Sequence, residues 1–272
     1  MSRGQSTVLA TGLAATAIAI LLPASASALK VRTASDSTAN AHGLLKATAQ
    51  CKPNEHVVSG GFRAPDQGYA FVSRAKGPSA WTVVAENVDL SLTAFAYCTN
   101  RLENSVRSES KRVSPPAGTR VNAKATCPRR KAAVSGGYAI IDPDAKAHDL
   151  VVFNLRRKGK RSWGVSAFND VDTQTTLKVF AYCVRGVDVE VRSARSEPVP
   201  RDTAGSGTAR CRDGEELLSG GFKTSPKPDY QNDLGPDFFY FDSWRPGTRS
   251  WKASGINYSD VAGRITAFAY CR

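Results

Sequence analysis

One pattern of residues occurs three times along the chain, and it constrains the fold more than any other feature. Each copy opens with a cysteine, continues after seven residues with Ser-Gly-Gly and an aromatic residue, and ends with Phe-Ala-Tyr-Cys. Between these ends every copy carries Phe-x5-Gly-x3-Trp-x5-Asn. Agreement at so many fixed spacings predicts a repeat architecture in which the copies share one structure.

The cysteines of the repeat predict a set of disulfides. Six cysteines allow fifteen pairings, and equivalence among the copies selects the pairing of the first with the last cysteine of each copy. The predicted bridges are Cys51–Cys98, Cys127–Cys183 and Cys211–Cys271. Each closes a loop of roughly 50 residues and contributes roughly 4 kcal/mol in the chain-entropy model. We therefore expect each copy to be one stapled sheet.

The segments between the motifs have the alternation and the β-branched and aromatic content of strands. The glycine four residues before each tryptophan predicts a hairpin turn, and the Gly-Gly pair predicts a bulge or a close backbone approach. The fold class is therefore all-β. The three antiparallel repeats, 29–101, 102–186 and 187–272, form either a pseudo-threefold, β-prism-like assembly or a row of small β-sandwiches.

The N-terminus reads as an export signal. Arg3 precedes an apolar run over 8–22, and the small residues 26–28 form a cleavage site, so residues 1–28 are a predicted signal peptide. No second long apolar run follows, so we expect no transmembrane segment in the mature chain. The protein is thus predicted to be secreted, and extracellular or associated with the cell wall.

The chain is basic, with a formal net charge of +13. Such a charge favours anionic partners, although it also serves general solubility. The candidate anion-binding residues form two clusters, Arg156, Arg157, Lys158, Lys160 and Arg161 in a hairpin and Arg129, Arg130 and Lys131 after Cys127. They are either a clamp for a phosphate or carboxylate polymer or a solvated hairpin tip. No aromatic platform typical of specific nucleic-acid binding accompanies them.

No residue pattern points to a catalytic centre, a metal or a cofactor. Ser59, Ser135 and Ser219 of the Ser-Gly-Gly motif have no repeated histidine or acid beside them, and a strand bulge is the favoured interpretation. The histidines at 42, 56 and 148 are not shared among the repeats. Asp89, Asp172 and Asp260 are loosely repeated acids and the basis of an alternative, a glycan-acting enzyme, which would need paired carboxylates.

Repeat 3 carries an insertion with two possible uses. Its aromatic binding candidates are Tyr230, Phe239 and Tyr240, and a minor alternative is a calcium site at Asp229, Asn232, Asp233 and Asp237. An interaction or inhibitor module that presents this loop is a further alternative. The repeated tryptophans share a strand face with apolar residues, which favours a core position over stacking on a sugar.

The pattern from Cys51 to Arg272 resembles secreted actinobacterial proteins with a cysteine-rich opening, a Gly-Gly pair, a Trp-x5-Asn strand and a terminal Ala-Tyr-Cys. The resemblance implies export and a β-fold and transfers no catalytic residue. The three-unit layout is also similar to β-prism proteins such as the vitelline membrane outer layer proteins, whose sequence motifs differ from these. We therefore expect a secreted, non-catalytic binding or surface-associated protein for an anionic or carbohydrate polymer of the cell envelope.

Overall fold

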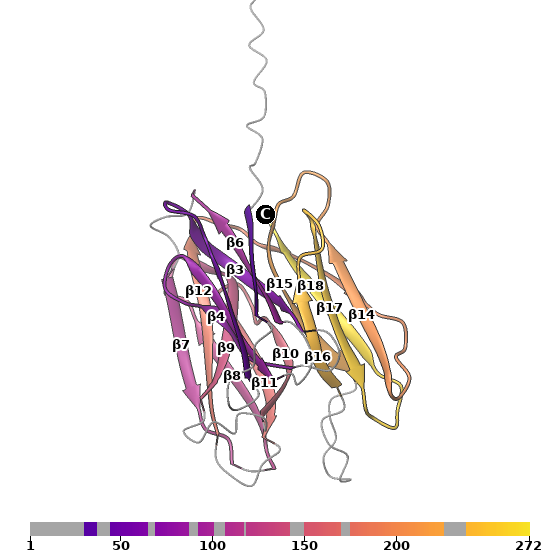
Figure 1. Ribbon diagram of the computed structural model, residues 1–272. Coiled ribbons are helices and arrows are strands. Elements are labelled where there is room, and N and C mark those ends of the chain that lie inside the picture. Colours follow the sequence, from indigo (N-terminus) through magenta and orange to yellow (C-terminus); the bar gives the residue numbers. More distant parts are fainter. Residues whose placement is uncertain are drawn as a thin grey trace, which may run out of the picture.

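The computed structural model describes residues 30–36, 44–64, 69–86, 92–100, 107–116, 118–141, 150–169, 175–225 and 238–272. These residues form eighteen β-strands and no helix, so the predicted all-β fold is confirmed (Figure 1). Accordingly, no helix in these ranges has the length and hydrophobicity that a membrane span requires.

Each repeat contributes six strands. Repeat 1 forms β1 (Lys30–Asp36), β2 (Leu44–Gln50), β3 (His56–Arg63), β4 (Tyr69–Ala75), β5 (Ala80–Glu86) and β6 (Leu92–Thr99). Repeat 2 forms β7 (Arg107–Val113), β8 (Arg120–Thr126), β9 (Lys131–Ile141), β10 (Leu150–Arg157), β11 (Ser162–Asn169) and β12 (Thr176–Arg185). Repeat 3 forms β13 (Glu190–Arg195), β14 (Thr203–Arg210), β15 (Leu217–Ser225), β16 (Phe238–Trp244), β17 (Ser250–Asn257) and β18 (Arg264–Cys271).

The strands build three six-stranded antiparallel sheets, and every sheet combines strands of two repeats. Sheet A has the order β1-β6-β3-β16-β17-β14, sheet B β2-β5-β4-β9-β12-β7, and sheet C β13-β18-β15-β10-β11-β8. Repeat 1 thus shares sheet A with repeat 3 and sheet B with repeat 2, and repeats 2 and 3 share sheet C. The expectation of one sheet per repeat is wrong, because each repeat divides its strands between two sheets.

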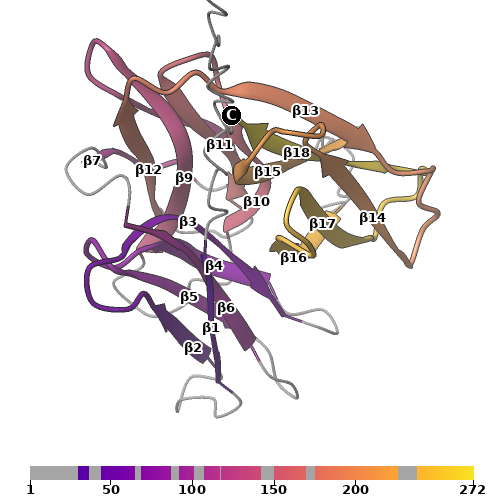
Figure 2. The ribbon, with the colours of Figure 1, turned by 90° about the horizontal axis from the view of Figure 1, so that it is seen from above.

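The exchange of strands closes a ring, which is consistent with the threefold alternative. Figure 2 shows the indigo, magenta and yellow parts of the chain around a common centre. A row of separate sandwiches would pair the strands of a repeat only with one another, whereas β3, β9 and β15 each pair with a strand of another repeat.

The glycine pair makes these junctions possible. Each junction between repeats is short and consists of two residue pairs. A Cβ on the second glycine would lie closer than 3.0 Å to a carbonyl oxygen of the neighbouring repeat, from Gly61 to Ser243, Gly137 to Ser73 and Gly221 to Leu155. The first glycine makes room for the tryptophan of its own repeat, Gly60 for Trp81, Gly136 for Trp163 and Gly220 for Trp251. The predicted close approach is therefore confirmed, in the form of a contact between repeats.

The serines of the motif link the repeats at the centre. The register of each Ser-Gly-Gly strand shifts beside the serine, so the predicted bulge is also present. Each hydroxyl donates to a bulge carbonyl of another repeat, Ser59 to Leu218, Ser219 to Val134 and Ser135 to Val58. These three bonds run around the ring in one direction. A buried hydroxyl with such a partner stabilises the junction.

Tyrosine and tryptophan also meet between repeats. All three repeated tryptophans are at most 2% exposed, which confirms the predicted core position. Each contacts the tyrosine of Phe-Ala-Tyr-Cys from a neighbouring repeat edge to face, with centroids 5.1–5.6 Å apart, in the pairs Trp81–Tyr182, Trp163–Tyr270 and Trp251–Tyr97. The tyrosine hydroxyl accepts a hydrogen bond, at 2.7–2.8 Å, from a backbone N–H of the repeat that contains the tryptophan. Burial raises the pKa of these tyrosines well above the usual value.

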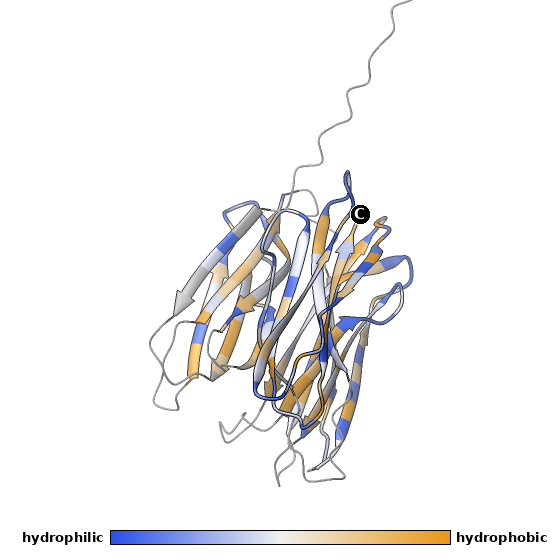
Figure 3. Ribbon diagram, turned by 90° about the vertical axis from the view of Figure 1, so that its right-hand side faces the viewer, coloured by the Kyte–Doolittle hydropathy of each residue, from blue (hydrophilic) through white to orange (hydrophobic). Residues whose placement is uncertain are grey.

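The predicted disulfide pairing is confirmed for all six cysteines. The bridge joins two sheets, because Cys51 directly follows β2 of sheet B whereas Cys98 lies in β6 of sheet A. The same relation holds in the other repeats, so the three bridges link A to B, B to C and C to A. Along the edge strands β8 and β14 buried residues alternate with exposed ones. Figure 3 shows hydrophobic and hydrophilic residues interspersed along the strands of the molecule.

We predict that Gly137→Ala lowers the free energy of unfolding by roughly 2–4 kcal/mol, because the added methyl group displaces the backbone of another repeat. Urea denaturation of the intact protein measures the change. Gly164→Ala is the control, since its Cβ would meet only the side chain of Lys158 on an exposed hairpin, and we expect a change under about 1 kcal/mol. Equal losses in the two variants would contradict the role of the junction.

Candidate anion-binding site

Five of the eight predicted basic residues, drawn from both clusters, come together on one side of the β10–β11 hairpin. They border an open depression with a volume of about 420 Å³. Its lining residues are Arg130, Lys131, Ala132, Arg157, Lys160, Arg161, Gly186, Val187 and Asp188. Five of these nine residues are basic and one is acidic, so the depression suits an anionic ligand.

Two arginines of the depression hold the hairpin in place. Arg157 donates to the carbonyl oxygens of Val189 and Lys160 at 2.9 and 2.7 Å. Arg161 donates twice to the carbonyl oxygen of Cys127, at 3.1 and 2.7 Å. Burial lowers the pKa of Arg157 from its ordinary value, and nearby Tyr270, Asp188 and Glu190 partly oppose that change. The exposed Arg130 and Lys160 are better placed to meet a ligand.

Arg130 has a left-handed backbone conformation, which glycine and asparagine adopt more readily than arginine does. Its φ angle is +66°, in the left-handed region. The equivalent positions of repeats 1 and 3 hold Asn54 at +65° and Gly214 at +83°, the residue types that tolerate this region best. Repeat 2 therefore accepts a backbone cost of about 1 kcal/mol to place an arginine there. Strain of this kind often accompanies a functional position.

Repeat 2 also reverses the charge at the next position. In repeat 1, Glu55 accepts hydrogen bonds from Arg32 of β1 at 3.0 and 3.1 Å. In repeat 3, Glu215 accepts from Arg192 of β13 and from the Arg212 N–H, which lower the pKa of its carboxyl.

In repeat 2, Lys131 occupies the position of Glu55 and Glu215. The arginine partner is replaced as well, because Glu109 is paired with Ala181 in the same register in which Arg32 is paired with Ala96 and Arg192 with Ala269. The exchange puts a lysine at the depression in place of a carboxylate.

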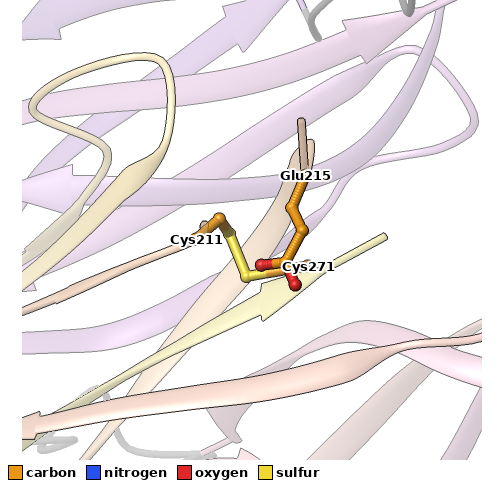
Figure 4. A group of neighbouring side chains, drawn as sticks. All are labelled: Cys211, Glu215 and Cys271. Atoms are coloured by element: carbon orange, nitrogen blue, oxygen red, sulfur yellow. A yellow bond between two sulfur atoms is a disulfide. The ribbon is translucent and has the colours of Figure 1, made fainter. Parts of the chain in front are cut away.

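Glu215 lies beside two cysteine sulfurs, an arrangement that resembles a metal site. Figure 4 shows its carboxylate next to Cys211 and Cys271. The two sulfur atoms are bonded to each other at 2.03 Å, so neither is a thiolate that can bind a metal. The carboxylate serves the ion pair with Arg192 instead.

The remaining predicted residues lie elsewhere. Arg156 and Lys158 line a second depression on the other side of the same hairpin, because consecutive strand residues point to opposite faces. Arg129 is exposed and borders neither depression. The serines of the Ser-Gly-Gly motif, for which the sequence favours a strand bulge over a nucleophile, are 1% exposed and donate to backbone carbonyls.

Several candidates lie outside the described residues, namely His42, Asp89, His148, Asp172 and the insertion with Tyr230 and the calcium set at Asp229, Asn232, Asp233 and Asp237. The backbone of Phe239 and Tyr240 belongs to β16, but their side chains are outside the description too. His56 is half-buried. Asp260 is half-exposed and forms an ion pair with Arg201.

Comparisons with known proteins give no assignment for this site. No protein-family model matches the chain, and no match is found among curated proteins.

One ionisable residue that sequence reasoning missed is Asp242 of β16. It is 7% exposed, and its Oδ1 lies 3.8 Å from Arg63 Nε. Burial raises the pKa of its carboxyl from 3.8 to about 6, and the charges of Arg63 and Lys252 oppose the shift. Nothing in the local sequence marks this residue, because its burial depends on pairing between repeats.

We predict that Asp242→Asn raises stability at neutral pH. The folded carboxyl binds its proton more tightly than the unfolded one, so the wild-type free energy of unfolding falls as pH rises from about 4 to about 6. The variant lacks this fall, which amounts to at most about 3 kcal/mol. Urea denaturation at pH 4 and pH 7 measures the difference. The control Asp260→Asn keeps Asp242 and should retain the wild-type fall in stability between pH 4 and pH 7. Identical pH profiles for wild type and Asp242→Asn would contradict the assignment.

Proposed function

We propose that this protein is an exported, non-catalytic binding protein for an anionic polymer of the cell envelope. The observation that carries the proposal is the meeting of basic residues from two separate segments, 130–131 and 157–161, at one depression. The reversal of charge at Lys131 and the arginine at a left-handed backbone position support it, because the equivalent turns of the other repeats hold a glutamate and Asn54 or Gly214 at these two positions. The net charge of +13 adds a long-range attraction for such a polymer.

The proposed location outside the cell rests on two features. The first is the signal-like N-terminal segment. The second is the set of three disulfides, which form and persist in oxidising compartments.

A glycan-acting enzyme is the alternative from another class of function. Such an enzyme needs two carboxylates about 5–9 Å apart. Release of soluble fragments from the polymer separates this alternative from simple binding.

We predict that Arg130→Ala together with Lys160→Ala weakens binding to purified cell wall by about tenfold, because two cations leave the depression. Cosedimentation with insoluble wall at low and high salt gives the apparent affinity. Binding of the wild type should weaken as salt screens the charges, and no soluble fragments should appear.

The matched control is Arg129→Ala with Lys76→Ala, which removes the same charge from exposed positions outside the depression. It should bind nearly as the wild type does. If both double variants lose affinity equally, general positive charge rather than this depression is responsible, and the proposed site is wrong.

A further inference from the structure

A second depression lies on the outer face of sheet C, and it differs in kind from the first. Its volume is about 390 Å³. The lining residues are Arg120, Asn122, Phe153, Asn154, Arg156, Lys158, Ser166, Lys223 and Thr224. Four are cations and four are uncharged polar residues, and none is acidic.

The three repeats allow the outer faces of the sheets to be compared position by position. In sheet C the pairing aligns Asn122, Ser166, Asn154 and Lys223 in one row across four strands. The equivalent row of sheet B is Lys46, Val84, Val72 and Ala139. The equivalent row of sheet A is Ser206, Ser254, Asp242 and Arg63. Because valine and alanine are accommodated at three of these positions in sheet B, the fold itself does not require polar residues there.

Three polar residues of the row are joined in a network that is buried at Asn154 and Ser166 and exposed at Asn122. Asn154 is 5% exposed and donates through Nδ2 to Ser166 Oγ at 3.0 Å. Ser166 is 3% exposed and donates in turn to Asn122 Oδ1 at 2.6 Å. The second amide atom of Asn154, Oδ1, has no hydrogen-bond partner in the described part of the chain. Burying an amide with an unused acceptor is costly, and sheet B avoids this cost with valines.

Two cations beside this network, Arg156 and Lys158, are positioned by contacts with neighbouring strands. Arg156 lies over the ring of Phe268, with its guanidinium carbon 5.5 Å from the ring centroid. Lys158 runs across β11 where Gly164 has no side chain, since a Cβ there would lie 2.6 Å from Lys158 Cγ. The equivalent positions of Gly164 are Thr82 in β5 and Lys252 in β17. Sheet C alone therefore leaves this path open for a lysine.

We propose that the sheet C depression binds an oxyanion carried on a hydroxylated unit, such as a sugar phosphate or a uronate. The arginines and lysines neutralise the oxyanion, and charge-assisted hydrogen bonds to such groups are the strongest available. The Asn154–Ser166–Asn122 network binds the hydroxyl groups, for which amide and hydroxyl groups supply both donors and acceptors. This site is separate from the depression of the proposed function. A test can therefore contradict one of the two proposed sites without contradicting the other.

Calorimetric titration of the intact, disulfide-bonded protein tests the proposal with four probes. Glucose 6-phosphate and glucuronate combine the two features, inorganic phosphate supplies only the anion, and glucose only the hydroxyls. We expect at least one of the first two to bind about tenfold or more tightly than inorganic phosphate, and glucose to bind still more weakly. The tighter of the two identifies the oxyanion as phosphate or carboxylate. Equal affinity for all three anions would overturn the proposal.

Variants copied from sheet B distinguish the two parts of the site. Asn154→Val with Ser166→Val reproduces the residues of β4 and β5 and should remove the preference over inorganic phosphate. Lys158→Ala should lower the affinity for the preferred probe about tenfold, and Gly164→Thr, with the β5 residue in the path of Lys158, should have a similar effect. The control Lys76→Ala removes the lysine of the equivalent hairpin in repeat 1 and should change nothing.

Thermal unfolding first confirms that each variant is folded. Retained preference in the double valine variant, or an equal loss in Lys76→Ala and Lys158→Ala, would contradict the site.

Discussion

The close approach of backbones at the junctions between repeats is the constraint on which the rest of the structure depends. Glycine at positions such as 61 and 137 leaves the space in which a strand of one repeat pairs with a strand of another. Once the strands are shared, the tyrosine of each repeat reaches the tryptophan of its neighbour, and each disulfide spans two sheets. The residues common to all three repeats therefore form the contacts that hold the repeats together. None of them forms a ligand site that is particular to one repeat.

Function, in this account, depends on positions where the repeats differ. Repeat 2 supplies Arg130, Lys131 and Lys160 at one depression and Arg156 and Lys158 at another. Beside Arg156 and Lys158, the positions of Asn154 and Ser166 hold valines in sheet B, and the position of Asn154 holds a buried carboxyl in sheet A. Threefold repetition thus provides an internal comparison, in which a shared scaffold carries three chemically different outer faces.

Repetition also explains how much of the structure could be predicted from the sequence. The disulfide pairing, the bulge before Gly60 and the buried position of Trp81 follow from equivalence among copies and from strand alternation. The division of each repeat between two sheets could not be predicted, because pairing between distant strands leaves no local signal. For the same reason Asp242 and Asn154 were missed, since only the register across repeats places them opposite Arg63 and Lys223.

Folding of one isolated repeat tests this account most directly. The fragment 187–272 contains all strands of repeat 3 and its disulfide, but it lacks both partner half-sheets. We predict that the oxidised fragment gives no dispersed amide NMR spectrum as a monomer, and that any folded form sediments as an assembly of several copies. A monomeric fragment with a dispersed spectrum and a cooperative unfolding transition would contradict the shared-sheet account.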